Sequence, residues 1–263
     1  MELLNKKYQL PQTVLTALEI DKDIILTEKE IIEAVMVANR NKKANIHREQ
    51  YKNKLLSDTS WKPFDYEDLE MYFQQRYFEL FEKDFDYNEF TEPVIEKILK
   101  YFANDKSFES LGDGYSLRKG LFIIGPVGVG KTSIFRALQA IVPRQFRIVH
   151  CEKDVEQSYS EAGSSCIDAF VEVKYQSDQR PRGCLFDDFG TESVANHFGN
   201  RKSVMDSIIQ AIYPNRTHFN CFHIVSNLYP KDLTEKYDGR TVDRMVEMFN
   251  FIKFNPDTPS KRA

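Results

Sequence analysis

The stretch "GLFIIGPVGVGKTS", residues 120–133, decides the fold class expected for this chain. Its first part, the apolar run at 121–124, suits a buried β-strand, and "TSIFRALQAI" at 132–141 is helix-like. Between them lie the fixed positions of the pattern G-x-x-x-x-G-K-[ST]: Gly125, Gly130, Lys131 and Thr132. A strand, a glycine-spaced loop and a helix in this order predict a phosphate-binding loop.

The loop has the chemistry needed to hold the phosphates of ATP or ADP. Glycines let backbone N–H groups wrap an anion, and the N-terminus of the following helix adds partial positive charge. Lys131 would reach the β- and γ-phosphates in a pocket open to water, and the Thr132 hydroxyl would bind Mg²⁺. The expected nucleotide contacts are Gly125, Pro126, Gly128, Val129, Gly130, Lys131, Thr132 and Ser133. A chance glycine turn is the alternative, and the flanking strand and helix argue against it.

Two carboxylates follow a second apolar run. In "CLFDDFGTES", residues 184–193, Asp187 and Asp188 end a predicted strand. At the carboxyl end of a parallel strand they would face the ligand crevice. There Asp187 would bind Mg²⁺, and Asp188 would polarise a water for attack on the γ-phosphate. A solvated turn is the alternative, and Glu192 is the next candidate for polarising the water.

Polar side chains further along the chain are additional candidates. Asn227 ends the apolar run of "FHIVSNLYP" and could orient the attacking water, although it could equally form a turn before Pro230. Arg240 and Arg244 are four residues apart, so on a helix they share a face. Either could stabilise transition-state charge on a γ-phosphate, or pair with nearby acids at the surface. Arg262, in the final "PSKRA", is either a phosphate contact or part of a charged tail.

Short apolar runs separated by helical stretches predict the fold class. Besides 121–124, strand-like runs occur at 146–150, 184–186, 221–225 and 249–254. This alternation predicts an α/β protein, a P-loop NTPase with a parallel sheet flanked by helices. The polar stretch at 107–120 contains glycines and suits a linker. We therefore expect a mostly helical partner-binding region at 1–106 and an ATPase domain at 107–263.

The residues before 107 contain three predicted helices, at 26–41, 65–85 and 92–105. A basic segment at 40–54 could contact nucleic-acid phosphates, although a solvated helix face is the favoured interpretation. Aromatic residues are dense after residue 60, and such density forms a core more often than a docking surface. These residues are Trp61, Phe64, Tyr66, Tyr72, Phe73, Tyr77, Phe78, Phe81 and Phe85.

The composition is that of a folded globular protein. Of the 263 residues, 41% are hydrophobic and 29% are charged, which excludes a disordered chain. The formal net charge of −4 excludes a strongly basic nucleic-acid binder. None of the four cysteines stands in a C-x-x-C pair, and no apolar run approaches the length of a membrane span. We expect a soluble protein of the reducing cytoplasm, with Cys184 and Cys221 as buried thiols.

The phosphate loop, the acidic strand end, the asparagine and the arginines occur in an order that resembles the AAA+ ATPases of the bacterial helicase-loader group, which includes DnaC and IstB. The resemblance rests on "GLFIIGPVGVGKTS", "LFDDFGTES", "IVSNL" and "GRTVDRM", with "PSKR" near the end, and spans residues 115–262. It implies that Lys131 and Thr132 are Walker A contacts and that Asp187 and Asp188 form the Walker B pair. It also implies that Asn227 is sensor 1, Arg244 the arginine finger and Arg262 sensor 2.

The resemblance further implies an activity and partners. Members of the group hydrolyse ATP with Mg²⁺, assemble as ATP-dependent homo-oligomers, and bind single-stranded DNA or a replicative helicase; their helical lid is reduced or absent. Asp188 stands where many AAA+ proteins have glutamate, and its shorter reach implies slow hydrolysis. The main expectation is a helicase-loader ATPase of DNA replication. An IstB-like transposition helper and a non-hydrolysing, ATP-gated adaptor are the alternatives.

Overall fold

The computed structural model describes residues 35–39, 42, 65–175, 181–192, 195–197 and 200–261. The chain divides into two compact units, Met1–Ser60 and Trp61–Ala263. In the first unit, residues 35–39 are helical and lie within the helix predicted at 26–41. Lys42, just after that range, is helical too. The basic segment at 40–54, apart from Lys42, and the aromatic residues Trp61 and Phe64 lie outside the described residues.

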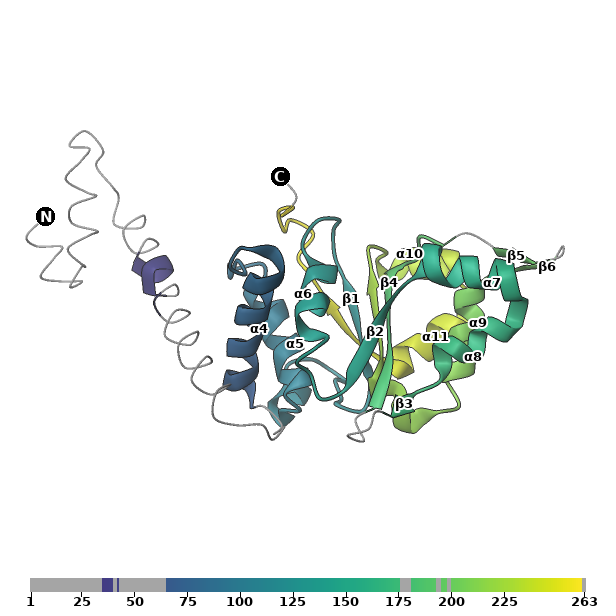
Figure 1. Ribbon diagram of the computed structural model, residues 1–263, viewed down its shortest axis with the longest axis horizontal. Helices are drawn as coiled ribbons and strands as arrows, with labels where there is room; N and C mark the ends of the chain where they lie inside the picture. Colours follow the sequence, from purple (N-terminus) through teal and green to yellow (C-terminus); the bar gives the residue numbers. More distant parts are fainter. Residues whose placement is uncertain are drawn as a thin grey trace, which may run out of the picture. The chain divides into compact units, whose positions relative to one another are not determined.

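A parallel sheet forms the centre of the second unit (Figure 1). Its strands lie in the order β2-β4-β7-β1-β8, and every neighbouring pair is parallel. The strands are β1 (Gly120–Ile124), β2 (Gln145–His150), β4 (Pro181–Phe189), β7 (Phe222–Ser226) and β8 (Phe249–Lys253). Short β3 (Lys174–Tyr175) pairs antiparallel with β4, and β5 (Ala195–His197) pairs with β6 (Asn200–Lys202) in a separate hairpin. All five strands expected from the sequence are confirmed.

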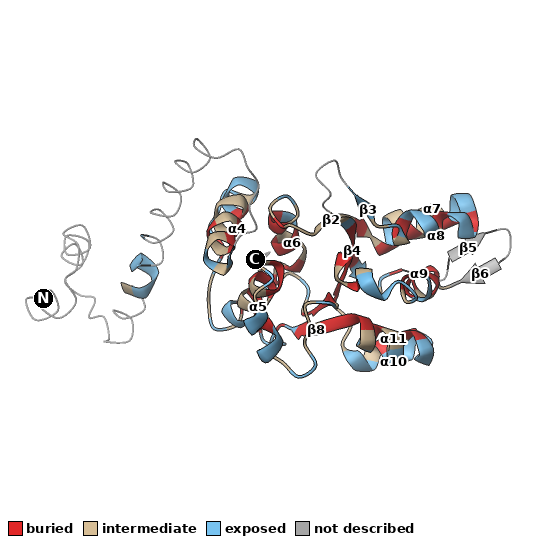
Figure 2. Cartoon of the chain, turned by 90° about the horizontal axis from the view of Figure 1, so that it is seen from below, coloured by how far each residue is buried: buried red, intermediate tan, exposed pale blue. Residues whose placement is uncertain are grey.

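Helices cover both faces of this sheet (Figures 1 and 2). One face carries α4 (Tyr66–Phe81), α5 (Glu92–Phe102) and α6 (Lys131–Leu138). The other carries α7 (Gln157–Ala162), α8 (Ile167–Val171), α9 (Val204–Ile212), α10 (Pro230–Lys236) and α11 (Gly239–Met248). Short 3₁₀ turns lie at Lys106–Ser110, Gly163–Cys166 and Arg216–Cys221, and a π-helical turn at Cys151–Glu156. The expected α/β class, a parallel sheet flanked by helices, is confirmed.

Strand β1 shows why the strand sequences are apolar throughout rather than alternating. Successive side chains of a strand point to opposite faces of the sheet. Leu121 and Ile123 therefore join the core under α4–α6, and Phe122 and Ile124 join the core on the opposite face. Because both faces are covered, every residue of β1 is buried.

The two helices that precede the sheet begin and end at identifiable signals. The Asp65 side chain accepts a hydrogen bond from the Asp68 N–H at 2.8 Å, which caps the start of α4. The helix ends at Phe81, earlier than the predicted 85, because Glu82 adopts the left-handed conformation with φ of 55°. Helix α5 has Pro93 in its first turn, as predicted.

Helices α4 and α5 belong to the same compact unit as the sheet. This unit begins at Trp61, so it extends further toward the N-terminus than the boundary at 107 expected from the sequence. Val94, Ile98 and their neighbours on α5 pack in one core with β1. The sequence reveals that this helix is amphipathic, but not which surface its apolar face covers. The loop expected at 107–120 remains largely irregular in the structure.

Several of the described aromatic residues near α4 belong to the core, as favoured from the sequence. Phe73, Tyr77 and Phe85 are buried and contact one another edge to face or tilted, with ring centroids 5.2–5.8 Å apart. Tyr66 and Phe81 are partly buried and pack against this core. Tyr72 is partly exposed, and 38% of the surface of Phe78 is exposed.

The cysteines behave as small apolar side chains. All four are buried and free, which confirms the expectation for Cys184 and Cys221. Burial raises the pKa of the Cys221 thiol to about 11, so this group stays protonated near neutral pH. Within the described part of the chain, no helix is long and apolar enough to cross a membrane.

Candidate nucleotide site

The glycine-spaced loop joins β1 to α6 in a conformation that only glycine adopts easily. Gly128 and Gly130 have φ values of 88° and 94°, in the left-handed region. At Gly128 an added Cβ would lie 2.2 Å from Ser260 Oγ, so the site also lacks space for a side chain. The sequence pattern therefore corresponds to a strand–loop–helix unit with the expected backbone shape. The fold is that of an α/β P-loop protein.

Lys131 lies at the centre of this loop. Its Nζ donates to Gly125 O at 2.7 Å, to Pro126 O at 2.8 Å and to Asn227 Oδ1 at 2.6 Å. Asn227 is close because β7, which it follows, pairs directly with β1. The lysine is 6% exposed, so it is more enclosed than the open pocket expected from the sequence, although it lines a cavity.

Thr132 and Asp187 form a second contact at this edge of the sheet. The Thr132 hydroxyl donates to Asp187 Oδ1 at 2.9 Å. Asp187 is fully buried, and its Oδ2 accepts no hydrogen bond from the described residues. Burial raises the pKa of this carboxyl, the Asp188 charge raises it further, and the Thr132 hydrogen bond opposes both. A buried carboxylate oxygen without a donor is suited to a cation.

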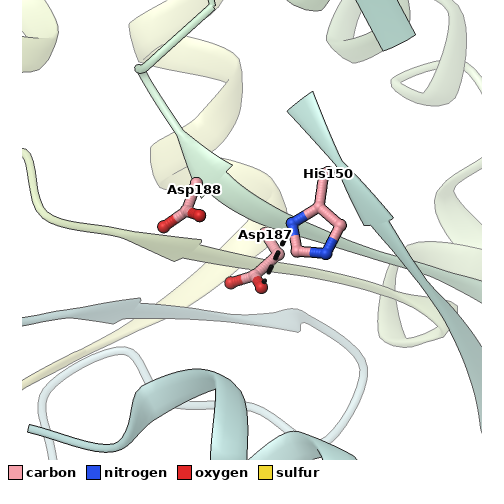
Figure 3. Close-up of side chains that lie close together, drawn as sticks. All are labelled: His150, Asp187 and Asp188. Atoms are coloured by element: carbon pink, nitrogen blue, oxygen red, sulfur yellow. Dashed lines mark ion pairs between the residues drawn. The ribbon is translucent and has the colours of Figure 1, made fainter. Parts of the chain in front are cut away.

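His150 completes the surroundings of Asp187 (Figure 3). Its Nδ1 lies 3.6 Å from Asp187 Oδ2, because β2 and β4 pair with His150 opposite Asp187. Ligand-type atoms of His150, Asp187 and Asp188 all lie within 4.8 Å of one another. Together with the Thr132 hydroxyl, the two carboxylates provide the oxygen donors that Mg²⁺ prefers.

Asp188 lies at an irregularity near the end of strand β4. The pairing of β4 with β7 shifts between Phe186 and Phe189, and Asp188 has φ of 54°. Its exposed side chain lines a cavity of about 230 Å³ together with residues of the P-loop, including Lys131 and Thr132. Asn227 lines the same cavity. This cavity therefore brings together seven of the expected site residues: Gly128, Gly130, Lys131, Thr132, Ser133, Asp188 and Asn227.

Glu192, the reserve candidate for polarising water, is held inside the protein instead. It is buried, its Oε2 accepts from Gly190 N at 2.8 Å, and its Oε1 accepts from the Tyr237 hydroxyl. Lys236 Nζ also donates to the Gly190 and Glu192 carbonyls. Burial raises the pKa of Glu192, while these donors lower it. Glu192 does not line the P-loop cavity, and its contacts tie the loop after Asp188 to α10.

Removing the Tyr237 hydroxyl is expected to destabilise the protein. Tyr237→Phe leaves Glu192 Oε1 buried without this donor, which costs about 1–3 kcal/mol of the free energy of unfolding. Denaturant unfolding measures the loss. Tyr175→Phe is the matched control, because Tyr175 is exposed and its hydroxyl contacts the partly buried His218 ring in the described structure. Equal stabilities of the two variants would contradict the importance of the Tyr237–Glu192 contact.

Arg240 and Arg244 lie on α11, outside the P-loop cavity of their own chain. The Arg244 guanidinium stacks over the Tyr213 ring, 4.6 Å from its centroid. Arg216 stacks over the same ring at 5.2 Å and pairs with Glu247 at 2.6 Å. Arg244 therefore belongs to a surface cluster with Tyr213, Arg216 and Glu247. Arg262 lies outside the described residues.

Several residues at the cavity were not predicted as site residues. Lys261 lines it, donates its backbone N–H to Gly128 O at 2.8 Å, and places Nζ 4.0 Å from the Phe85 ring centroid. Burial lowers the Lys261 pKa, the Asp86 charge raises it and the Lys83 charge lowers it. Lys261 had a signal in the sequence, its place in "PSKR", whereas Tyr77, Phe81 and Lys83 had none. His150 does not line this cavity, but it lies beside Asp187; its signal was its place at the end of a predicted strand.

Comparisons with known proteins find solved structures that are similar to this chain at low sequence identity. No family model and no curated protein matches this chain. Solved structures with a similar chain path include AMPPCP-bound DnaA from Aquifex aeolicus, at 18% identity and a TM-score of 0.42, over 75% of this chain and 52% of that one. A DnaC helicase loader has 18% identity and a TM-score of 0.45, and the match covers 69% of this chain and 99% of that one. A DNA replication initiation factor has 19% identity and a TM-score of 0.41, and the match covers 65% of this chain and 48% of that one. This chain thus spans about half the length of two of these proteins.

Proposed function

We propose that this chain binds ATP with Mg²⁺ and hydrolyses it slowly, as an AAA+ ATPase of the helicase-loader type. The observation that carries the proposal is the convergence of Lys131, Asp188 and Asn227 on one cavity beside the P-loop. Lys131 begins α6, Asp188 lies near the end of β4 and Asn227 follows β7, and together they supply a cation, a carboxylate and an amide. This is the set of groups that phosphoryl transfer to water requires around a γ-phosphate.

Nucleotide binding is expected to rearrange the contacts of Lys131. The acceptors described above for its Nζ include the neutral oxygens of Gly125, Pro126 and Asn227. A triphosphate offers charged oxygens, with which an ammonium forms stronger hydrogen bonds. As Lys131 turns to the phosphates, the Asn227 amide becomes available to the γ-phosphate or to the attacking water.

Thr132 and Asp187 would hold Mg²⁺, which would neutralise phosphate charge when bound. The hydroxyl oxygen of Thr132 already lies 2.9 Å from Asp187 Oδ1, so one Mg²⁺ ion could bind both oxygens. Asp188 would take the remaining role, accepting a hydrogen bond from the water that attacks the γ-phosphorus. The products are ADP and phosphate, and the short aspartate side chain suits slow turnover.

A second subunit would complete the site. Arg244 lies in a surface cluster and does not line the cavity of its own chain. An arginine placed there can reach a γ-phosphate only from a neighbouring molecule. The shared site makes assembly depend on ATP, and the C-terminal Lys261 and Arg262 would add phosphate contacts within the chain.

Replacing Asp188 by asparagine tests the hydrolytic step. Asp188→Asn keeps the size of the side chain but removes the charge that orients water, so the variant should bind ATP, hydrolyse it poorly and remain assembled longer. Turnover and light scattering with ATP measure both effects. Glu152→Gln, a change of an exposed acid, serves as the charge-matched control. If Asp188→Asn hydrolyses ATP at the wild-type rate, Asp188 is not the group that polarises the attacking water.

The short reach of Asp188 also supports a second candidate, an ATP-gated adaptor that does not hydrolyse its nucleotide. Steady-state phosphate release by the full chain, with and without single-stranded DNA, separates the two. Product formation that Lys131→Ala abolishes supports the ATPase. ATP-dependent assembly without phosphate release supports the adaptor.

The biological partner is proposed to be a replicative helicase, and an IstB-like role in transposition is the alternative. Co-sedimentation of the full chain with purified helicase, in ATP and in ADP, tests the first. Binding that depends on ATP supports a loader. Binding to a transposase but not to a helicase would favour the alternative.

A further inference from the structure

Three side chains that can bind a metal ion meet where the neighbouring strands β2 and β4 end (Figure 3). They are His150 at the end of β2, and Asp187 and Asp188 near the end of β4. Ligand-type atoms of all three lie within 4.8 Å of one another. In the proposed ATPase the two carboxylates have roles but the imidazole has none. A nitrogen ligand is what distinguishes this cluster from an ordinary Mg²⁺ site, which consists of oxygen atoms.

The distance between His150 and Asp187 fits two ligands of one ion better than a hydrogen bond. His150 Nδ1 lies 3.6 Å from Asp187 Oδ2, whereas an N–H···O hydrogen bond spans about 2.7–3.2 Å. In a tetrahedral site with ligands about 2.0–2.2 Å from the metal, two ligand atoms lie about 3.3–3.6 Å apart. An ion between these two atoms could therefore bind both without a large movement of either side chain.

The two oxygens of Asp187 have different surroundings. The Thr132 hydroxyl donates to Oδ1 at 2.9 Å, and this contact orients the carboxylate. Oδ2 is buried and accepts no hydrogen bond from the described residues. A buried charged oxygen without a partner is costly, and a cation on the His150 side would remove that cost. The Mg²⁺ of the proposed nucleotide site would lie instead on the Oδ1 side with Thr132, so the two positions are distinct.

The charge and the accessibility of the cluster also suit a divalent ion. Two carboxylates and a neutral imidazole carry two negative charges, which balance the two positive charges of the ion. His150 is half-buried, and the exposed Asp188 side chain lines the P-loop cavity, so an ion can enter from solvent. A water molecule on that open side would complete a site with four ligands.

We infer that this cluster binds a divalent transition-metal ion, such as Zn²⁺ or Co²⁺. The ligands are an imidazole nitrogen of His150 and the carboxylates of Asp187 and Asp188. Imidazole suits these ions, whereas Mg²⁺ takes oxygen ligands and keeps several of its waters. The ion links the ends of β2 and β4 beside the P-loop. Its binding needs no nucleotide, so the site goes beyond the proposed ATPase function.

Titration of Co²⁺ into the nucleotide-free full chain tests the site, because the visible absorption of bound Co²⁺ reports its ligands. We expect saturable binding that a large excess of Mg²⁺ does not displace. Changes in the second shell weaken metal binding by about 10- to 100-fold, so His150→Gln, which removes a ligand, should weaken it at least as much. His218→Gln, a change of another partly buried histidine, should leave the affinity unchanged. Thermal unfolding without metal reports whether each variant is folded, and Asp188→Asn, a change of an exposed ligand, gives the same test if His150→Gln does not fold.

Other results would overturn this assignment. A lack of saturable Co²⁺ binding would leave His150 and Asp187 as an ion pair, and an unchanged affinity in His150→Gln would place the ion elsewhere. Charge-transfer absorption typical of cobalt–thiolate bonds would assign the ion to a cysteine. Displacement by an equal concentration of Mg²⁺ would show that the cluster does not select transition metals. Because the titration contains no nucleotide, it can fail while ATP binding succeeds, or the reverse, so the failure of one proposal is distinguishable from the failure of the other.

Discussion

Lys131→Ala is expected to lose detectable ATP binding while the protein remains folded. The ammonium donates to the carbonyls of Gly125 and Pro126 and lines the cavity in which the β- and γ-phosphates would lie. A hydrogen bond to a charged group contributes about 1.5–3 kcal/mol. Loss of one such bond weakens binding about 10- to 100-fold, and Lys131 has three donors to lose. Lys83 and Lys261 also line the cavity, but neither contacts the loop carbonyls in this way.

Thermal unfolding with and without ATP measures this loss. ATP at a hundredfold excess over its Kd stabilises a binding protein by about 2.7 kcal/mol, which raises its unfolding midpoint. The wild type should show this shift and Lys131→Ala should not, while both unfold cooperatively without ATP. Lys153→Ala removes an exposed lysine and should retain the shift. An equal shift of the unfolding midpoint in Lys131→Ala would show that the P-loop lysine is not needed for ATP binding and would contradict the proposed site.

The nucleotide loop could be predicted from the sequence because its determinants are local. Glycine positions, one lysine and one hydroxyl lie within a few residues, and the flanking strand and helix have their own periodicities. The left-handed conformations of Gly128 and Gly130 follow from the same pattern. What the pattern does not contain is the partner of Lys131. Asn227 lies 96 positions away, and only the pairing of β1 with β7 brings it within 2.6 Å.

Residues missed at the site reach it through tertiary structure. His150 meets Asp187 because the register of β2 against β4 places them opposite each other. Lys261 arrives because the chain returns after β8 and bonds to Gly128. Neither register nor return path is encoded in a short motif. The burial of Glu192 is a similar case, since its donor Tyr237 comes from the end of a distant helix.

The position of α4 could not be derived from its sequence. The aromatic-rich stretch predicts a helix whose aromatic side chains form a core, which the structure contains, but many surfaces could complete such a core. In the structure α4 packs with α5 and α6, and Tyr77 and Phe81 reach the P-loop cavity. The sequence boundary at 107 separated these helices from the sheet because the glycine-containing loop was the clearest local change in composition.

Arg244→Ala is expected to bind ATP normally and to hydrolyse it poorly, because in the proposed shared site this residue would act on a neighbouring subunit. Loss of an arginine finger lowers turnover by about 10³–10⁵ in GTPases. A smaller factor is expected here, since the short side chain of Asp188 is proposed to make hydrolysis slow already. Phosphate release at saturating ATP should fall, and the affinity for a fluorescent ATP analogue should not.

The surface cluster around Tyr213 provides a matched control. Arg216 stacks on the same ring as Arg244 and pairs with Glu247, but it precedes β7 rather than lying on α11. Arg216→Ala should therefore retain turnover. If Arg216→Ala loses as much activity as Arg244→Ala, the loss reports damage to the cluster rather than a missing charge. Arg240, one turn away on α11, is the reserve candidate for the finger.

Mixing two inactive variants gives the sharpest test of the shared site. Lys131→Ala lacks a working P-loop but carries an intact Arg244, and Arg244→Ala has the opposite defect. In a mixed assembly, an intact loop on one subunit can face an intact arginine on the next, so activity should partly return. Turnover per subunit of the wild type should likewise rise with protein concentration. Activity that is independent of concentration in a monomeric preparation, together with no recovery on mixing, would place every catalytic group within one chain.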